Sequence, residues 1–386
     1  MEKKERIKKR PTLLQGMIPI LFMVISLSFG VGVLKLRTEP IIILSAFVAG
    51  VIAWKLGYTW DEMQAGVIEK ISRALPATLI LWSVGLLIGS WMYAGTVPMI
   101  IYYGVDIVNP KFLLVTAFLI TAVLSTVTGT SWGSAGTIGV AIMGIAAGLG
   151  VSLPATAGAV VAGSYFGDKL SPLSDTTNLA PIAAGSELYE HIRHMLYTTI
   201  PASLVALVVY FIVGMNSAGS ATTPETVLTL QAQLSEMFNW NIILLLPVAL
   251  IIAGSLLKWP TIPTMLGTSL FSVLIGMFVQ GFTLKNGFIS LIQGFNVSMT
   301  GFAGDVAPIV TTLINRGGVV SVTVTTVLIF CAMGFAGSMS VTGMLDVVLE
   351  AMLKKVKTSG GVILSTIASC FTVAFVTGIS YLSILI

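Results

Sequence analysis

The sequence predicts an all-α, polytopic membrane protein, and two observations support this fold class. Hydrophobic residues make up 55% of the 386 residues and charged residues only 9%, whereas soluble domains carry about 25% charged residues to cover their surface. Apolar runs close to the length that a helix needs to cross a hydrocarbon core of about 30 Å recur from end to end. The sequence shows no alternating strand pattern, so helices are expected rather than a closed barrel.

Nine apolar runs are the predicted membrane spans. They cover residues 13–34, 41–54, 77–95, 112–127, 195–214, 241–257, 262–282, 318–339 and 361–376. Residues 1–12 form a basic tail, in which "MEKKERIKKR" places six Lys and Arg before the first run. Such residues are retained in the cytoplasm, so we expect a cytoplasmic N-terminus. The first run is too long for a signal peptide, and no second basic cluster indicates a nucleic-acid partner.

One short pattern occurs twice. Residues 127–132 ("VTGTSW") and 376–381 ("VTGISY") share Val-Thr-Gly-x-Ser-aromatic after an apolar run, and the segments upstream of each copy also resemble one another. We therefore expect two transmembrane repeats, residues 13–214 and 240–386, joined by a polar linker over 215–239. Repeats of this kind, often inverted, are typical of secondary transporters.

Each copy interrupts an apolar run with glycine and hydroxyl residues. Glycine and threonine lower helix stability, and irregular backbone at membrane depth is tolerated where it is buried in protein or lines a polar cavity. Matched interruptions in two halves indicate a transporter binding site. Close helix packing through small residues is the alternative interpretation.

The first copy also contains "GTSWG", which matches the G-x-S-x-G pattern of a serine nucleophile at Ser131. A catalytic serine needs a base, and the only histidines, His191 and His194, lie in the polar stretch "ELYEHIRHM". The second copy lacks the closing glycine. An intramembrane serine hydrolase is therefore a remote alternative, and we expect no enzyme.

Among the segments that lie between apolar stretches, the most polar is "GSYFGDKLSPLSDTTNLAP" at 163–181. Pro172 and Pro181 oppose a continuous helix, so the segment is interpreted as a re-entrant hairpin tip, with an ordinary loop as the alternative. Carboxylates and hydroxyls suit hard cations. Burial stabilises the protonated acid, so the same oxygens can hold a cation or a proton. We expect Asp168 or Asp175 to bind Na⁺ and H⁺ alternately.

The remaining polar residues carry weaker signals. Asp305 and Arg316 are interpreted as turn residues or a structural ion pair, and Cys331 and Cys370 as core residues. No organic cofactor or redox-metal motif occurs in the sequence, so the expected small partners are Na⁺ and H⁺.

At "GDKLSPLSDTTNLAP", "TGTSWG" and "GTVPMIIYYG" the chain resembles the NhaC family of bacterial sodium/proton antiporters, in the ion-transporter superfamily, over essentially its whole length. Some members of that family exchange malate for lactate with sodium and protons. The resemblance implies two inverted repeats, each with a re-entrant hairpin and a broken helix. It also implies elevator-type movement against a scaffold, a bacterial inner-membrane location and a homodimer.

The resemblance further implies a site built from three elements. Its residues are Thr128, Gly129, Thr130 and Ser131 in the first broken helix, Thr377, Gly378 and Ser380 in the second, and Asp168, Ser171, Ser174, Asp175, Thr176 and Asn178 in the hairpin.

The expected function is exchange of Na⁺ for H⁺ by alternating access. The alternative is sodium- and proton-coupled exchange of organic acids such as malate and lactate, which the sequence does not separate from simple Na⁺/H⁺ antiport. Because family members run longer and the chain stops at "SYLSILI", we expect a C-terminal truncation within the second broken helix.

Overall fold

A computed structural model describes residues 8–172, 174, 176–177, 180–181, 185–217, 224–257, 259–353 and 359–377. Within these residues every regular element is a helix. Six of the helices are long and apolar enough to cross a membrane, or up to nine if each of three bent pairs forms one span. The predicted class, a polytopic all-α membrane protein, is confirmed, whereas the inverted repeats and the elevator movement stay predictions.

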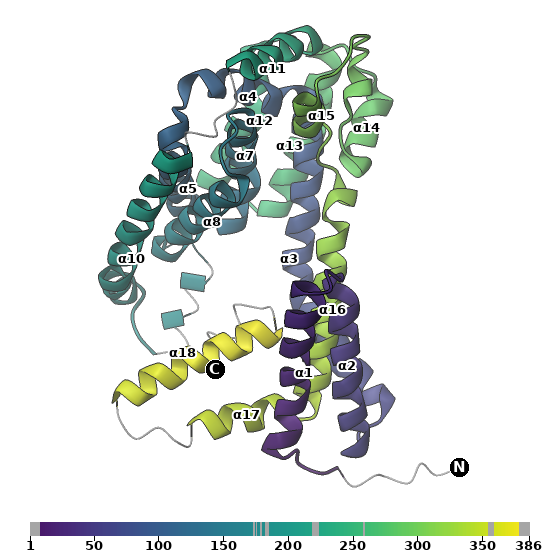
Figure 1. Cartoon of the computed structure of the whole chain (residues 1–386), viewed down its shortest axis with the longest axis vertical. Helices are drawn as coiled ribbons and strands as arrows, with labels where there is room; N and C mark the ends of the chain where they lie inside the picture. Colours follow the sequence, from purple (N-terminus) through teal and green to yellow (C-terminus); the bar gives the residue numbers. More distant parts are fainter. Residues whose placement is uncertain are drawn as a thin grey trace. The chain divides into compact units, whose positions relative to one another are not determined.

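The helices follow one another along the chain as shown in Figure 1. They are α1 (Leu13–Gly32), α2 (Thr38–Lys55), α3 (Trp60–Ala94), α4 (Thr96–Ile107), η1 (Pro110–Phe112), α5 (Leu113–Thr128), α6 (Ser131–Ser134), η2 (Ala135–Gly139), α7 (Val140–Gly148), α8 (Leu153–Leu170), α10 (Leu188–Ser217), α11 (Pro224–Met237), η4 (Ile242–Leu245), α12 (Leu246–Leu256), α13 (Thr261–Val279), α14 (Leu284–Gln293), η5 (Val297–Thr300), α15 (Pro308–Ile314), η6 (Val319–Val322), α16 (Thr323–Val341), α17 (Met344–Leu353) and α18 (Ser359–Thr377).

Each of the nine predicted runs lies, to within three residues at its ends, in a helix or in a 3₁₀-helix and the α-helix that continues it. One span was missed. The elements α6, η2 and α7 together cover 131–148, which is also long and apolar enough to cross a membrane. Its glycines, serines and threonine dilute the apolar signal, so hydropathy alone does not mark this segment.

The chain forms two compact units. Unit 1 comprises residues 1–78 and 323–386, and unit 2 comprises residues 79–322. One boundary falls within the helix α3 and the other between η6 and α16. The predicted repeats are defined by sequence similarity rather than by compactness, so these units do not test them.

In unit 1, α1 and α2 lie side by side, and α2 also packs on α16. Their shared core includes Met23, Ile42, Phe335 and Met339, all almost fully buried. The basic tail is attached to this unit, because Arg10 forms an ion pair of 2.5 Å with Glu350 of α17.

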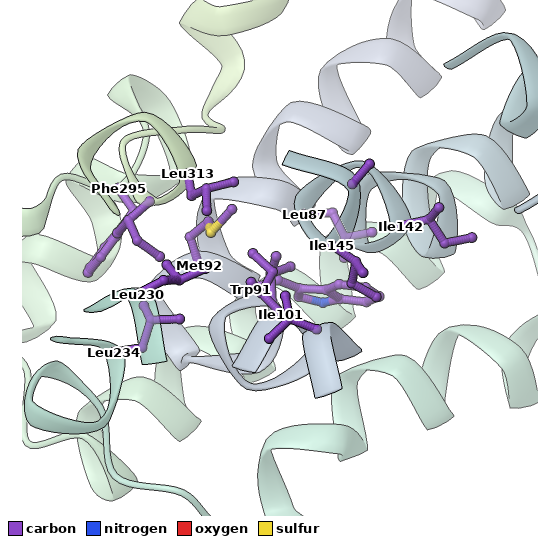
Figure 2. Close-up of a cluster of buried hydrophobic side chains, with 14 of the residues drawn as sticks. Leu87, Trp91, Met92, Ile101, Ile142, Ile145, Leu230, Leu234, Phe295 and Leu313 are labelled. Atoms are coloured by element: carbon purple, nitrogen blue, oxygen red, sulfur yellow. The ribbon is translucent and has the colours of Figure 1, made fainter. Parts of the chain in front are cut away.

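Unit 2 contains the larger core (Figure 2). The side chains labelled there come from α3, α4, α7, α11 and α15 and from the segment after α14, and further core residues come from α5, α8, α13 and α14. The helix α11 lies within the predicted linker 215–239, yet its Leu230 and Leu234 are fully buried in this core. The described part of that segment is therefore a packed part of unit 2.

Candidate functional site

The helix break predicted at the first repeated pattern is present in unit 2. The helix α5 ends at Thr128, and Gly129 follows with a left-handed φ of 68°, a conformation that glycine adopts without steric cost. Thr130 is extended, and its side chain accepts a hydrogen bond of 3.1 Å from the Gly133 amide. Threonine is a preferred N-cap residue, so Gly129 ends one helix and Thr130 starts the next.

The chain reverses direction at this break. Ile120 and Leu124 of α5 line the same apolar groove as Thr137 and Ile138 of η2. Residues about equally distant from Thr130 on either side therefore face one another, as in a helical hairpin. The hairpin tip is formed by Gly129 and Thr130.

The returning arm of this hairpin is irregular. The segment η2 is a π-helix over Ala135–Gly139, and the Thr137 hydroxyl donates a hydrogen bond of 2.6 Å to the Gly133 carbonyl. Short π-helical segments within α-helices occur frequently at functional sites. Sequence analysis did not anticipate this feature.

The helix α8 packs against both arms. A Cβ on Gly163 would lie 2.2 Å from the Phe118 carbonyl oxygen, and one on Gly167 would lie 2.2 Å from that of Ala122. These contacts advance in the same direction along both helices, so α8 runs parallel to α5. Glycines spaced by four residues allow such close approach between membrane helices.

Asp168 lies near the hairpin tip. Gly139 of the returning arm faces Val160 of α8, since a Cβ on Gly139 would lie 2.5 Å from the Val160 side chain. Ser131 and Asp168 are each eight residues from that contact along antiparallel segments, which puts them at about the same level. The helices α6 and α8 also contact one another directly.

The end of α8 is closed by hydroxyl groups. Asp168 is 8% exposed, and its carbonyl oxygen accepts hydrogen bonds from the Ser171 amide at 3.1 Å and from the Thr177 hydroxyl at 3.0 Å. The hydroxyls of Ser174 and Thr176 lie 3.0 Å apart. Ser171, Ser174 and Thr177 are buried. The helix thus continues through Asp168 to Leu170 and stops just before Pro172.

Two further hydroxyls are buried where α8 meets α5. Ser125 donates a hydrogen bond of 2.6 Å to the Ser164 carbonyl. The Ser164 hydroxyl, one turn before Asp168, is buried and has no hydrogen-bond partner among the described residues. Neither serine, nor Thr177, was among the predicted site residues. Ser125 lies in an apolar segment, whose hydroxyl content was its only signal, and Ser164 and Thr177 lie in the polar segment 163–181 without being singled out as site residues there.

The structure therefore places Ser131, which starts α6, next to α8 at about the level of Asp168, with Gly129 and Thr130 just before it in the chain and Ser171 at the end of α8. Thr128 is the last residue of α5, and Thr377 is the last residue of α18 in unit 1. The other predicted site residues lie outside the described part of the chain; these are Asp175, Asn178, Gly378 and Ser380.

The chemistry of this end of α8 suits a hard cation. One carboxylate and several hydroxyls supply oxygen ligands. Within the described ranges no three His, Cys, Asp or Glu side chains lie close enough to hold a metal ion. Asp305 and Arg316 occupy turns, and no ion pair joins them in the described structure.

Comparison with known proteins gives several matches to antiporters. A sequence model described as the Na⁺/H⁺ antiporter family matches residues 163–386. A protein of Haemophilus influenzae named an uncharacterized Na(+)/H(+) antiporter is 44% identical, over 98% of this chain and 81% of that protein. The malate-2H(+)/Na(+)-lactate antiporter of Bacillus subtilis is 35% identical, over 94% and 76%. The Na(+)/H(+) antiporter NhaC of Alkalihalophilus pseudofirmus is 33% identical, over 92% and 75%.

Proposed function

The chain belongs to the Na⁺/H⁺ antiporter family, and from that premise we propose that it exchanges Na⁺ for H⁺ at the end of α8. The resemblance that the motifs indicate is thereby confirmed. Members of this family are transporters, so the chain is not an enzyme and the hydrolase alternative for Ser131 is wrong.

The observation that carries the proposal is the position of Asp168. Its side chain lies almost out of water at the end of α8, level with the tip at which α5 is interrupted. In our proposal the carboxylate neutralises Na⁺, while the hydroxyls of Ser131, Ser171 and Ser174 supply further oxygens. Asp175, seven residues further along the chain, would provide a second carboxylate, and Thr130, Thr176 and Asn178 further polar groups.

Competition on one carboxylate would couple the two ions. A buried carboxyl group is stable when it is protonated or when a cation neutralises it, but costly as a free anion. Binding of Na⁺ therefore displaces a proton, and protonation releases Na⁺. Exchange also requires the site to open alternately to the two sides of the membrane. We place the protein in the bacterial inner membrane with the basic tail in the cytoplasm, as a homodimer.

The test is Na⁺-driven proton movement in proteoliposomes that contain the full chain and a pH-sensitive dye. An asparagine amide can neither release a proton nor neutralise Na⁺, so Asp168→Asn should slow the flux by roughly 100-fold or more, a loss of about 3 kcal/mol in coupling. Asp305→Asn is the matched control, because Asp305 is exposed and, in the part of the chain that the structure describes, only its backbone carbonyl accepts a hydrogen bond. Wild-type flux in the Asp168→Asn variant would overturn the proposal.

Coupled transport of an organic acid is the second candidate. It is favoured by the 35% identical relative whose name states exchange of malate and lactate. Labelled malate and lactate in the same proteoliposomes distinguish the two functions. Uptake that depends on a Na⁺ gradient supports coupled transport, and Na⁺/H⁺ exchange that is independent of either acid supports simple antiport.

A further inference from the structure

Unit 2 contains a second polar region, in a cavity of about 660 Å³. Its polar lining consists of Gln293, Asn296, Asn315, Arg316 and Ser321. No Asp or Glu is among the lining residues, so Arg316 supplies the only formal charge. This volume lies within the range of about 300–1,000 Å³ that is usual for small-molecule sites and is far larger than a dehydrated Na⁺ needs.

The turn that carries Arg316 is fixed by its backbone. Gly317 and Gly318 follow with φ of 86° and 78°, which other residues rarely adopt. The Gly318 amide donates a hydrogen bond of 2.8 Å to the Gly85 carbonyl of α3, and the Arg316 carbonyl accepts one of 3.0 Å from the Phe295 amide. The turn is thus hydrogen-bonded both to α3 and to the segment after α14, and these bonds fix the position of the Arg316 backbone.

The Arg316 side chain is only partly used. Its Nε donates a hydrogen bond of 2.9 Å to the Thr312 carbonyl. Within the described structure its two terminal nitrogens form no hydrogen bond and no ion pair. A half-buried guanidinium that is oriented through Nε presents these nitrogens as a fork, the geometry that matches a carboxylate.

The neighbouring amide side chains add donors rather than acceptors. The Asn315 side-chain oxygen accepts a hydrogen bond of 2.7 Å from the Val297 amide, and that of Asn296 accepts one of 3.0 Å from the Ser298 amide. Each of these oxygens thus already accepts one hydrogen bond within its loop, while the N–H₂ groups of both side chains remain as donors for a ligand. A cavity with one cation and several donors favours an anion.

We propose that this cavity binds a small carboxylate, with the Arg316 terminal nitrogens on its two oxygens. The amides of Asn296 and Asn315 would donate to a hydroxyl or carboxylate oxygen of the same ligand, and Ile88, Val140 and Phe295 line the cavity as apolar contacts for a short carbon skeleton. One positive charge matches one carboxylate, so a monocarboxylate such as lactate binds more tightly than a dicarboxylate such as malate. This site is separate from the proposed cation site at Asp168.

The proposal is tested by equilibrium binding of labelled lactate to the purified full chain, without any ion gradient, so the result is independent of Na⁺/H⁺ exchange. A lost charge-assisted pair should weaken lactate binding roughly 10- to 100-fold in Arg316→Gln. Arg316→Lys keeps the charge but not the fork and should give an intermediate loss. Lys285→Gln is the control, since Lys285 is an exposed cation of the same unit outside the cavity lining.

A second variant guards against misfolding of the arginine variants. Asn296→Asp keeps the oxygen that accepts from Ser298 but places a negative charge at the cavity wall, so it should also weaken lactate binding, roughly tenfold or more. Unchanged lactate binding in both Arg316→Gln and Asn296→Asp would overturn the proposal. So would the absence of lactate binding by the wild-type chain, or tighter binding of inorganic phosphate or malate than of lactate.

Discussion

The end of α8 and the turn after α15 are two polar regions of unit 2. A left-handed glycine interrupts the helical path at both, Gly129 beside the first region and Gly317 in the second, but their charged side chains have opposite sign. At the end of α8 a buried carboxyl group is surrounded by hydroxyls, whereas the second region presents a guanidinium and amides to an open cavity. The glycine interrupts the helix in both regions. The charge of the neighbouring side chain then differs, with a carboxyl group that favours a cation in the first region and a guanidinium that favours an anion in the second.

The two regions also differ in how tightly they are enclosed. Asp168 lies on a helix that approaches α5 through Gly163 and Gly167, and three buried hydroxyl residues close the helix end. The cavity at Arg316 is larger than any single ion. Enclosure suits a small ion that must shed its water, and an open cavity suits a ligand with a carbon skeleton.

The largest expected effect on Na⁺-driven proton flux comes from displacing the carboxyl group of residue 168. Asp168→Glu keeps the charge but adds one methylene group in a closely packed place, so we expect Na⁺-driven proton flux roughly tenfold or more below wild type, because misplacement by about 1 Å is costly. The flux should still exceed that of Asp168→Asn. The measurement is the initial rate in proteoliposomes, and full activity of the Glu variant would contradict the tight enclosure of this region.

The next effect concerns the turn that carries Arg316. In Gly317→Ala the new Cβ would lie 2.3 Å from the Gly89 amide nitrogen at a φ of 86°, which adds a clash of about 1–3 kcal/mol to a left-handed penalty of about 1–2 kcal/mol. Gly301→Ala is the control, because Gly301 has a φ of 74° with no atom within 4 Å. Thermal unfolding in detergent should separate the two variants, and equal losses would mean that the turn tolerates a side chain.

A smaller effect is expected where α8 meets α5. Gly167→Ala would place a Cβ 2.2 Å from the Ala122 carbonyl oxygen, whereas Gly158→Ala, on the same helix, meets only the Tyr210 hydroxyl at 3.7 Å. Overpacking costs about 1–3 kcal/mol, so Gly167→Ala should lower the unfolding temperature and reduce Na⁺-driven flux. Gly158→Ala should do neither. Identical behaviour of the two variants would disprove the close approach of these helices.

The smallest effect concerns the helix cap at the hairpin tip. Thr130→Ala removes the oxygen that accepts from Gly133, which should cost about 1 kcal/mol of stability. Thr130→Ser retains an N-cap oxygen and should restore most of the loss. Unfolding temperatures of the three proteins test this, and no difference between the Ala and Ser variants would exclude a capping role.

Hydropathy predicted most of the candidate membrane spans found in the described residues, because a long apolar helix is visible in any local window. It missed residues 131–148, where glycine and hydroxyl residues mask the span, and it did not reveal that Leu230 and Leu234 of the expected linker enter the core. The break at Gly129 was predictable, since a glycine and a capping threonine act locally. The π-helix η2 was not, because no residue pattern marks it.

The two polar regions differ in the same respect. Asp168 was predicted as a site residue from a dense local motif, whereas Arg316 was interpreted as a turn or ion-pair residue. Its cavity joins α3, α7 and α14 with two loops, and no local pattern brings these segments together. The available signal was the glycine pair in "INRGG", which indicates a tight turn but not what the turn faces.

The central claim is that the Asp168 carboxyl group holds either Na⁺ or H⁺, and proton release from the purified chain tests it most directly. Na⁺ is added to the protein in weakly buffered detergent solution below the pH at which the group loses its proton, and a pH indicator follows the release. The wild-type chain and Asp305→Asn should release protons as Na⁺ binds, and Asp168→Asn should release none. The same Na⁺-induced release from folded Asp168→Asn would contradict the claim and assign the exchange to another group.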